Sequence, residues 1–184
     1  AAAPSGETDA PAVSRVVLVS VDGLRGDALQ HMPALQALRA RAAWTDSMLS
    51  VTPALTVPGH LAMFTGRDVT RFGLVSNTLD RAAGATLVFN RATTVFQWVR
   101  SSGGTSAALV GASLVPTAQL SEAAEFFAID EVVSVGAEPA AIGAQAVAAA
   151  TRPDAPSLLF VHVPTVDFAG HDHGWIRTDT AAAD

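Results

Sequence analysis

Three side chains that can bind a metal lie close together near the end of the sequence. Asp167 and His171 have i, i+4 spacing just after the apolar run SLLFVHV (157–163), and His173 follows. One divalent metal ion can accept both a carboxylate oxygen and an imidazole nitrogen. Because the whole chain has only five histidines, this concentration favours a metal site, and a solvated polar loop is the alternative interpretation.

Asp22 is a second candidate ligand, because it follows the β-branched run VVLVSV (16–21). Such a run predicts a strand that is buried on both faces, and the end of that strand would hold the Asp22 carboxylate in one place. A turn residue that accepts hydrogen bonds from backbone amides is the alternative. One class of phosphatases has a nucleophilic Asp in this place, but it requires another Asp two positions later, where this chain has Leu24.

A hydroxyl that could be phosphorylated lies at the start of a predicted helix. Thr56 precedes residues 57–65, which have Pro58 in the first turn and Gly66 at the end, as helices commonly do. Free amides and the macrodipole at a helix N-terminus favour an anion, so a phosphoryl group on Thr56 would lie among hydrogen-bond donors. An ordinary N-cap threonine is the alternative. For His60, inside the helix, packing or hydrogen bonding is favoured over metal binding.

These residues must be positioned by a set of strands and helices that the sequence also predicts. Besides the segments above, the pattern indicates strands at 106–110 and 125–129 and helices at 33–43, 93–100, 137–150 and from 178 to the end. Strands that alternate with helices predict an α/β domain with a mostly parallel central sheet and helices on both faces. In such sheets, ligands bind beyond the carboxyl ends of the strands, which is where Asp22 and the stretch after Val163 lie.

Composition excludes several other classes of protein. The 184 residues are 49% hydrophobic, which suits one domain with a buried core, and no apolar run approaches the length of a membrane span. The net charge is −6 and the arginines are scattered, so extended nucleic-acid binding is not expected. The chain lacks Cys and Lys, which excludes disulfides, thiolate zinc sites and an ordinary phosphate-binding loop.

The first residues differ in composition from the rest of the chain. Residues 1–14 are small and polar with prolines, which predicts a flexible lead-in before a domain at 15–184. Such a lead-in is compatible with what remains after a signal peptide is removed, and hence with a periplasmic or secreted protein; a cytoplasmic protein is the alternative. The sequence gives no indication of oligomeric state.

Four stretches in order resemble the alkaline phosphatase superfamily, in its type I phosphodiesterase/nucleotide pyrophosphatase branch. The family opens with a strand that ends in a metal-binding Asp, as in VSVDGLRGD, and continues with a Thr-x-Pro-x-His segment before a helix, as in LTVPGHLAMFTG. An Asn is expected about twenty residues later, where this chain has Asn77. The last motif, Pro-x-x-Asp-x-x-Gly-His-x-x-Gly, is similar to PTVDFAGHDHGW at 164–175.

The resemblance implies an alkaline-phosphatase-like core with two divalent metal ions, most commonly zinc. Asp22 and the Thr56 oxygen would bind one ion, and Asp167 with His171 would bind the other. Thr56 would attack phosphorus and form a phospho-threonine intermediate, while Asn77 and the helix amides would hold the phosphate oxygens. The implied substrate is small and phosphorylated, either a phosphodiester or a nucleotide. His173 lies where the family motif varies, so no role is assigned to it.

The sequence also departs from the family in two ways. An Asp-His pair and a further His, which complete the two metal sites in the family, do not follow before Asp184. The C-terminal part of the core is therefore expected to be missing, and the chain alone is expected to bind metal weakly and to have little activity. Gly59 replaces an Asn that is common in animal diesterases.

Several alternatives to a diesterase remain open at this stage. A phosphomonoesterase or a phosphonate hydrolase of the same superfamily could carry these motifs, although related monoesterases use a Lys that this chain lacks. A sulfatase would need Cys or Ser in place of Thr56. A catalytically incomplete fragment with only an anion or metal pocket is the non-enzyme alternative.

Overall fold

The computed structural model describes residues 15–68, 76–77, 93–111, 114 and 120–175. Its centre is a parallel sheet of four strands in the order β1-β4-β2-β3, namely β1 (Val16–Val21), β2 (Ser106–Gly111), β3 (Glu131–Val135) and β4 (Leu158–Val163). The helices are η1, a 3-10 helix (Gly26–His31), α1 (Pro33–Arg39), α2 (Thr56–Thr65), α4 (Val95–Ser101), α5 (Leu120–Phe127), α6 (Pro139–Thr151) and α7 (Thr165–His173).

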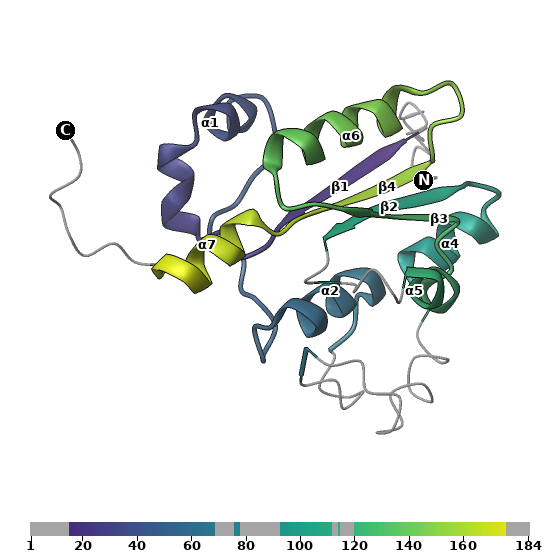
Figure 1. The fold of residues 1–184 in the computed structure, drawn as a ribbon, viewed down its shortest axis with the longest axis horizontal. Coiled ribbons are helices and arrows are strands. Elements are labelled where there is room, and N and C mark those ends of the chain that lie inside the picture. Colours follow the sequence, from purple (N-terminus) through teal and green to yellow (C-terminus); the bar gives the residue numbers. More distant parts are fainter. Residues whose placement is uncertain (1–14, 69–75, 78–92, 112–113, 115–119, 176–184) are drawn as a thin grey trace, which may run out of the picture.

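Helices cover both faces of the sheet, and the central strand β4 shows why. Its side chains alternate between the faces, so that Leu158 and Phe160 join the core beneath α2, α4 and α5, whereas Leu159 and Val161 join the core beneath α6. Figure 1 shows α6 on one side of the sheet and α2, α4 and α5 on the other. The predicted α/β class, with a parallel sheet between two layers of helices, is confirmed.

The predicted strand at 125–129 is wrong. Residues up to Phe127 form the end of α5, Ala128 turns the chain with a φ of 59°, and the strand follows at Glu131–Val135. A short apolar run does not distinguish a buried helix face from a strand, and here the two phenylalanines of EFF pack from a helix. The β-branched EVVSV that follows forms the strand instead.

Other boundaries differ less. The first predicted helix ends at Arg39 rather than at residue 43. Residues 1–14 and 178–184 lie outside the described residues, so the lead-in, the domain boundary and the last helix remain predictions. Within the described part of the chain, no helix is long and apolar enough to cross a membrane.

Candidate active site

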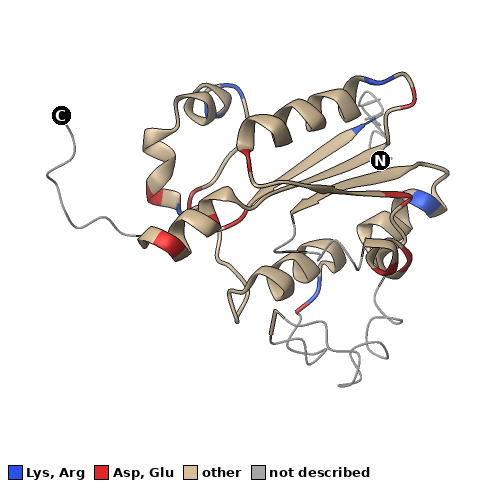
Figure 2. Ribbon diagram, in the orientation of Figure 1, with Lys and Arg blue, Asp and Glu red and all other residues tan. Residues whose placement is uncertain are grey.

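The candidate site begins where β1 and β4 end side by side. The two strands pair residue by residue from Val16 with Leu158 to Val21 with Val163, and the amide of Asp22 continues the ladder by donating to the Val163 carbonyl at 3.0 Å. The acidic residue after β1 and the start of α7 are therefore neighbours. Figure 2 shows acidic positions at this end of β1 and along α7.

Gly23 allows the two segments to approach closely. Its φ is 72°, and a Cβ at this position would lie 2.7 Å from the Cα of Asp167. Glycine is the residue that fits at this position, because it has no Cβ and adopts a positive φ at little cost. The turn after β1 thus packs directly against the first turn of α7, which brings Asp22 and Asp167 together.

Asp167 lies in the first turn of α7, one turn before His171. Its Oδ2 is 3.6 Å from His171 Nε2, and the Asp167 side chain is 16% exposed whereas that of His171 is 68% exposed. Burial and, next, the adjacent Asp22 carboxylate raise the pKa of Asp167 above its ordinary value, against smaller opposite effects of His171 and His162. Two carboxylates held this way repel each other unless a cation lies between them. His173 ends the same helix as an exposed residue.

Thr56 is the first residue of α2 rather than its N-cap. The N-cap is Leu55, which makes no side-chain cap, so the capping alternative for Thr56 is wrong. Instead, the Thr56 hydroxyl lies close enough to the Asp22 carboxyl to lower the pKa of that carboxyl. The hydroxyl, Asp22 and Asp167 therefore form one cluster, although they come from three separate parts of the sequence.

Asn77 also lies at the start of α2. Its Oδ1 accepts a hydrogen bond from the Val57 amide at 3.1 Å, which directs the NH₂ group of Asn77 away from that amide and leaves it as a donor. The expectation that several helix amides are free for an anion is only partly met, because Pro58 has no N–H and the Gly59 amide donates to Leu55.

Two buried histidines, His60 and His162, lie behind these residues. The sequence alone did not point to a role for His162. His162, on β4, is completely buried and lies 3.3 Å from Asp22 Oδ2 through its Nε2. His60, on α2, is 5% exposed and contacts the Thr56 carbonyl and the Ser20 hydroxyl. The available signal was that Ser20 and His162 interrupt two otherwise apolar strands, next to their carboxyl ends.

The electrostatics of this network favour an ionised Asp22. Burial of the Asp22 carboxyl raises its pKa, but hydrogen bonds from His162 and Thr56, together with the nearby His60, outweigh burial and hold the pKa below its ordinary value. Burial lowers the pKa of His60, so that its neutral form is favoured. Asp22 is therefore a carboxylate at neutral pH.

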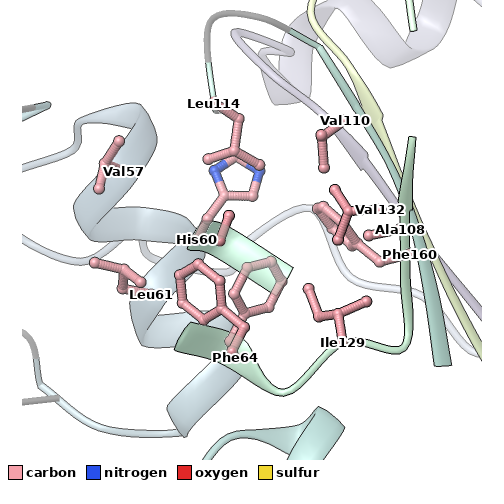
Figure 3. A pocket seen from close by; sticks show the side chains of 12 residues that line it. Val57, His60, Leu61, Phe64, Ala108, Val110, Leu114, Ile129, Val132 and Phe160 are labelled. Atoms are coloured by element: carbon pink, nitrogen blue, oxygen red, sulfur yellow. The ribbon is translucent and has the colours of Figure 1, made fainter. Parts of the chain in front are cut away.

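A cavity beneath α2 is a separate feature. Its lining is apolar apart from His60, and it includes Leu61, Phe64 and Phe160 from the core. Figure 3 shows His60 among these apolar side chains. With so few polar groups, the cavity belongs to the packing of α2 on the sheet and not to a substrate site.

The described residues contain no cluster of three or more His, Cys, Asp or Glu side chains arranged to hold a metal ion. The predicted pairs, Asp22 with Thr56 and Asp167 with His171, are each brought together. Their donors, which are carboxylate and hydroxyl oxygens and an imidazole nitrogen, suit zinc or a similar divalent ion. The repulsion between the two carboxylates also fits a bound cation.

The comparison with protein families decides which family these features belong to. The family model for type I phosphodiesterase / nucleotide pyrophosphatase matches residues 16–184. The chain belongs to this family. The branch of the alkaline phosphatase superfamily that the motifs resemble is thereby confirmed. None of the curated proteins compared with this phosphodiesterase-family chain matches it significantly.

Solved structures show the same fold. Murine ectonucleotide pyrophosphatase / phosphodiesterase 5 superposes on this phosphodiesterase-family chain with a TM-score of 0.65 and 20% identity, over 87% of this chain and 46% of that one. An inactive variant of the same murine protein, in complex with AMP, superposes with a TM-score of 0.66 and 20% identity, over 88% and 46%. The chain thus spans less than half the length of these relatives.

Proposed function

We propose that this chain carries the nucleophile and part of the metal site of a phosphoester hydrolase that acts on phosphodiesters or nucleotides. The observation that supports this most directly is that the Thr56 hydroxyl lies beside the Asp22 carboxyl and lowers its pKa, at the point where Asp167 packs against the turn after β1. A nucleophilic hydroxyl needs a neighbouring group that lowers its pKa or takes its proton. Family membership supports the same reaction class.

Asp22 and the Thr56 oxygen would hold one divalent ion, most commonly zinc, and Asp167 with His171 would hold the other. When bound, such ions supply positive charge that lowers the pKa of a hydroxyl and stabilises charge on a phosphoryl group. The residues fit this arrangement in donor type and in the mutual repulsion of their carboxylates.

The Thr56 oxygen attacks phosphorus, the bond from phosphorus to the leaving-group oxygen breaks, and a phospho-threonine forms; the leaving group departs with the proton that the hydroxyl gives up. The Asp22 carboxylate beside the hydroxyl orients it for this attack. The NH₂ group of Asn77 donates to a non-bridging phosphate oxygen, because its Oδ1 is already held by the Val57 amide. Water then hydrolyses the phospho-threonine and regenerates the hydroxyl.

Two observations bear on the substrate. A solved relative contains AMP, which supports a nucleotide or a nucleotide-derived diester. The absence of Lys from this chain favours a diester or pyrophosphate over a monoester, whose extra charge related enzymes hold with a Lys. Phosphomonoester and phosphonate hydrolysis are the competing reactions. A periplasmic or secreted location would be in keeping with the name of the murine ectonucleotide relative.

One observation favours a second candidate, a catalytically incomplete unit that binds an anion or a metal without turnover. The described residues offer only two donors to each metal, fewer than catalytic zinc sites usually have.

The test is Thr56→Ala, with hydrolysis of bis-p-nitrophenyl phosphate and p-nitrophenyl phosphate measured in the presence of zinc. We expect the substitution to abolish zinc-dependent hydrolysis, with the diester as the better substrate of the unsubstituted protein. Thr65→Ala is the matched control, because Thr65 lies in the same helix and only donates to the Leu61 carbonyl. A rate that Thr56→Ala leaves unchanged would favour the incomplete unit.

A further inference from the structure

The rings of His60 and His162 pack edge to face behind the candidate site. Their ring centroids are 5.0 Å apart with the planes at 87°, and both side chains are buried. One ring comes from α2 and the other from β4, so the pair joins the helix that carries Thr56 to the strand next to Asp22. The proposed reaction assigns no step to either ring.

The contacts of His162 select one tautomer. The Gly111 amide lies 3.3 Å from Nδ1, and because a backbone N–H can only donate, Nδ1 accepts and carries no proton. The proton of the neutral ring is therefore on Nε2, which donates to Asp22 Oδ2 at 3.3 Å. A Cβ at Gly111 would lie 2.8 Å from Pro164 Cγ and 3.2 Å from His162 Nδ1, so glycine makes this approach possible.

The contacts of His60 select the opposite tautomer. Its Nδ1 is 2.6 Å from the Thr56 carbonyl oxygen, and because a carbonyl can only accept, Nδ1 carries the proton. Burial lowers the pKa of His60 and favours the neutral ring, in which Nε2 accepts a hydrogen bond from the Ser20 hydroxyl at 2.9 Å. Ser20 is the β1 residue that pairs with His162 in the sheet, so both rings are anchored to the same pair of strands.

We propose that His60 and His162 are positioning residues, locked as neutral rings in opposite tautomers, that set the Thr56 backbone and the Asp22 carboxylate relative to each other. His60 holds the Thr56 carbonyl, and His162 holds Oδ2 of the carboxylate that lies beside the Thr56 hydroxyl. Neutral rings orient these groups without cancelling the negative charge of Asp22. This inference rests on the proposed function for its effect on the reaction, although the tautomers themselves do not.

The first experiment measures the tautomers directly, without an assay of activity. Long-range proton–nitrogen correlation spectra of the isotope-labelled 184-residue chain at neutral pH distinguish the two neutral tautomers from the imidazolium ion. We expect the proton on Nε2 in His162 and on Nδ1 in His60, whereas His31, an exposed residue of η1, should show averaged signals. Either buried ring in the other tautomer, or as an imidazolium, would overturn the proposal.

The second experiment compares His162→Gln with His162→Leu. Gln retains an N–H donor near the place of Nε2, whereas Leu fills the space without one. We expect Leu to lower kcat for the diester by about 10–100-fold, the usual effect of losing a partner of a metal ligand, with KM little changed, and Gln to recover most of the loss. His31→Leu, away from the site, is the control and should not change kcat.

Equal losses in the Gln and Leu variants, with the fold intact by circular dichroism, would contradict a role for the hydrogen bond. If both variants unfold, the tautomers in the unsubstituted chain still decide the question. A Thr56→Ala variant with full activity would overturn the proposed function but not the tautomers, so the two failures are distinguishable.

Discussion

Asp22 is the residue at which the contacts of the candidate site converge. Its carboxylate accepts a hydrogen bond from His162 and lies beside the Thr56 hydroxyl, and Asp167 packs against the turn that follows it. The hydrogen bonds favour the ionised form of Asp22 against the effect of burial, whereas Asp167, with the same carboxylate beside it, is held toward protonation. The two acids therefore have opposite preferences in the metal-free protein, because only one of them receives enough donors.

Asp167→Asn should stabilise the metal-free protein. The folded state raises the pKa of Asp167, so its ionised form is unfavourable in the fold at neutral pH, and a neutral amide of similar size removes that cost. We expect a gain of about 0.5 kcal/mol in the free energy of unfolding, measured by urea denaturation in EDTA. Asp172→Asn, an exposed position of the same helix, is the control. Hydrolysis by Asp167→Asn in zinc should fall, so a variant that is both less stable and fully active would contradict this role.

At the scale of elements, two sets of contacts join the sheet to its helices. One is the turn after β1, and the other is the ion pair between Arg100 and Asp130. The turn passes so close to α7 that only glycine fits at position 23. At the other end of the sheet, the carboxylate of Asp130, just before β3, accepts hydrogen bonds from the Ser106 amide at 2.8 Å and from Arg100 at 2.8 Å. These contacts connect α4, β2 and β3.

Gly23→Ala should destabilise the protein and disturb the site. A Cβ at this position would lie 2.7 Å from the backbone of Asp167, at a φ of 72°, and strain of this kind costs about 1–3 kcal/mol. Gly143→Ala is the matched control, because Gly143 lies inside α6 with open space around its Cα and alanine should stabilise a helix by about 0.5–1 kcal/mol. Thermal unfolding measures both. A neutral effect at Gly23 would mean that the turn and α7 lie farther apart.

Asp130→Asn should destabilise the protein in a pH-dependent way. Burial raises the pKa of Asp130, but the hydrogen bonds from Ser106 and Arg100 outweigh it and lower the pKa below its ordinary 3.8. The unfolded chain therefore binds more protons, so the stability due to this carboxylate is complete above pH 3.8 and is lost as pH falls through the lowered value.

We expect Asp130→Asn to cost about 1 kcal/mol at neutral pH and progressively less in acid, as measured by urea unfolding across the pH range. Asp154→Asn is the control. The Asp154 side chain is 84% exposed, and its ion pair with Arg152 is longer, at 3.5 Å. A loss that is the same at every pH would assign the effect to packing rather than to charge.

At the scale of the whole molecule, the parallel topology assembles the site from distant segments. Asp22 and His162 are separated by 140 positions in the sequence, yet they meet because β1 and β4 are neighbours that end together. The described part of the chain still offers only two donors to each predicted ion. The chain also spans less than half of its solved relatives.

Zinc binding by the 184-residue chain should be weak. Two protein donors to each ion are fewer than the three or four of stable zinc sites, so equilibrium dialysis should give no tight site. Substitution of both Asp22 and Asp167 by Asn should remove what binding remains. Two tight sites in the unsubstituted chain would contradict the donor set proposed here.

The sequence alone predicted the fold class, which the structure confirms, and the chemical type of the site, which remains a prediction. Its β-branched runs correctly indicated strands, but the prediction that residues 16–21 are buried on both faces is wrong, because β1 is an edge strand and Val17 and Val19 are 49% and 54% exposed. Residues that follow parallel strands lie at one edge of the sheet, so Asp22 and the stretch with Asp167 and His171 could be found without coordinates. Thr56 is indicated by its place at a helix start, and Asn77 only by the family resemblance, which the family match supports. Their chemical roles remain predictions.

Only the tertiary structure decided which groups contact one another. No local pattern indicates that Asn77 accepts a hydrogen bond from the Val57 amide, that Thr56 lies beside Asp22, or that His162 lies between Gly111 and Asp22. The strand order β1-β4-β2-β3 and the packing of α2 on the sheet produce these contacts. The EFF segment, which the sequence predicts as a strand, is helical for the same reason, because the packing around a short apolar run decides whether it forms a helix or a strand.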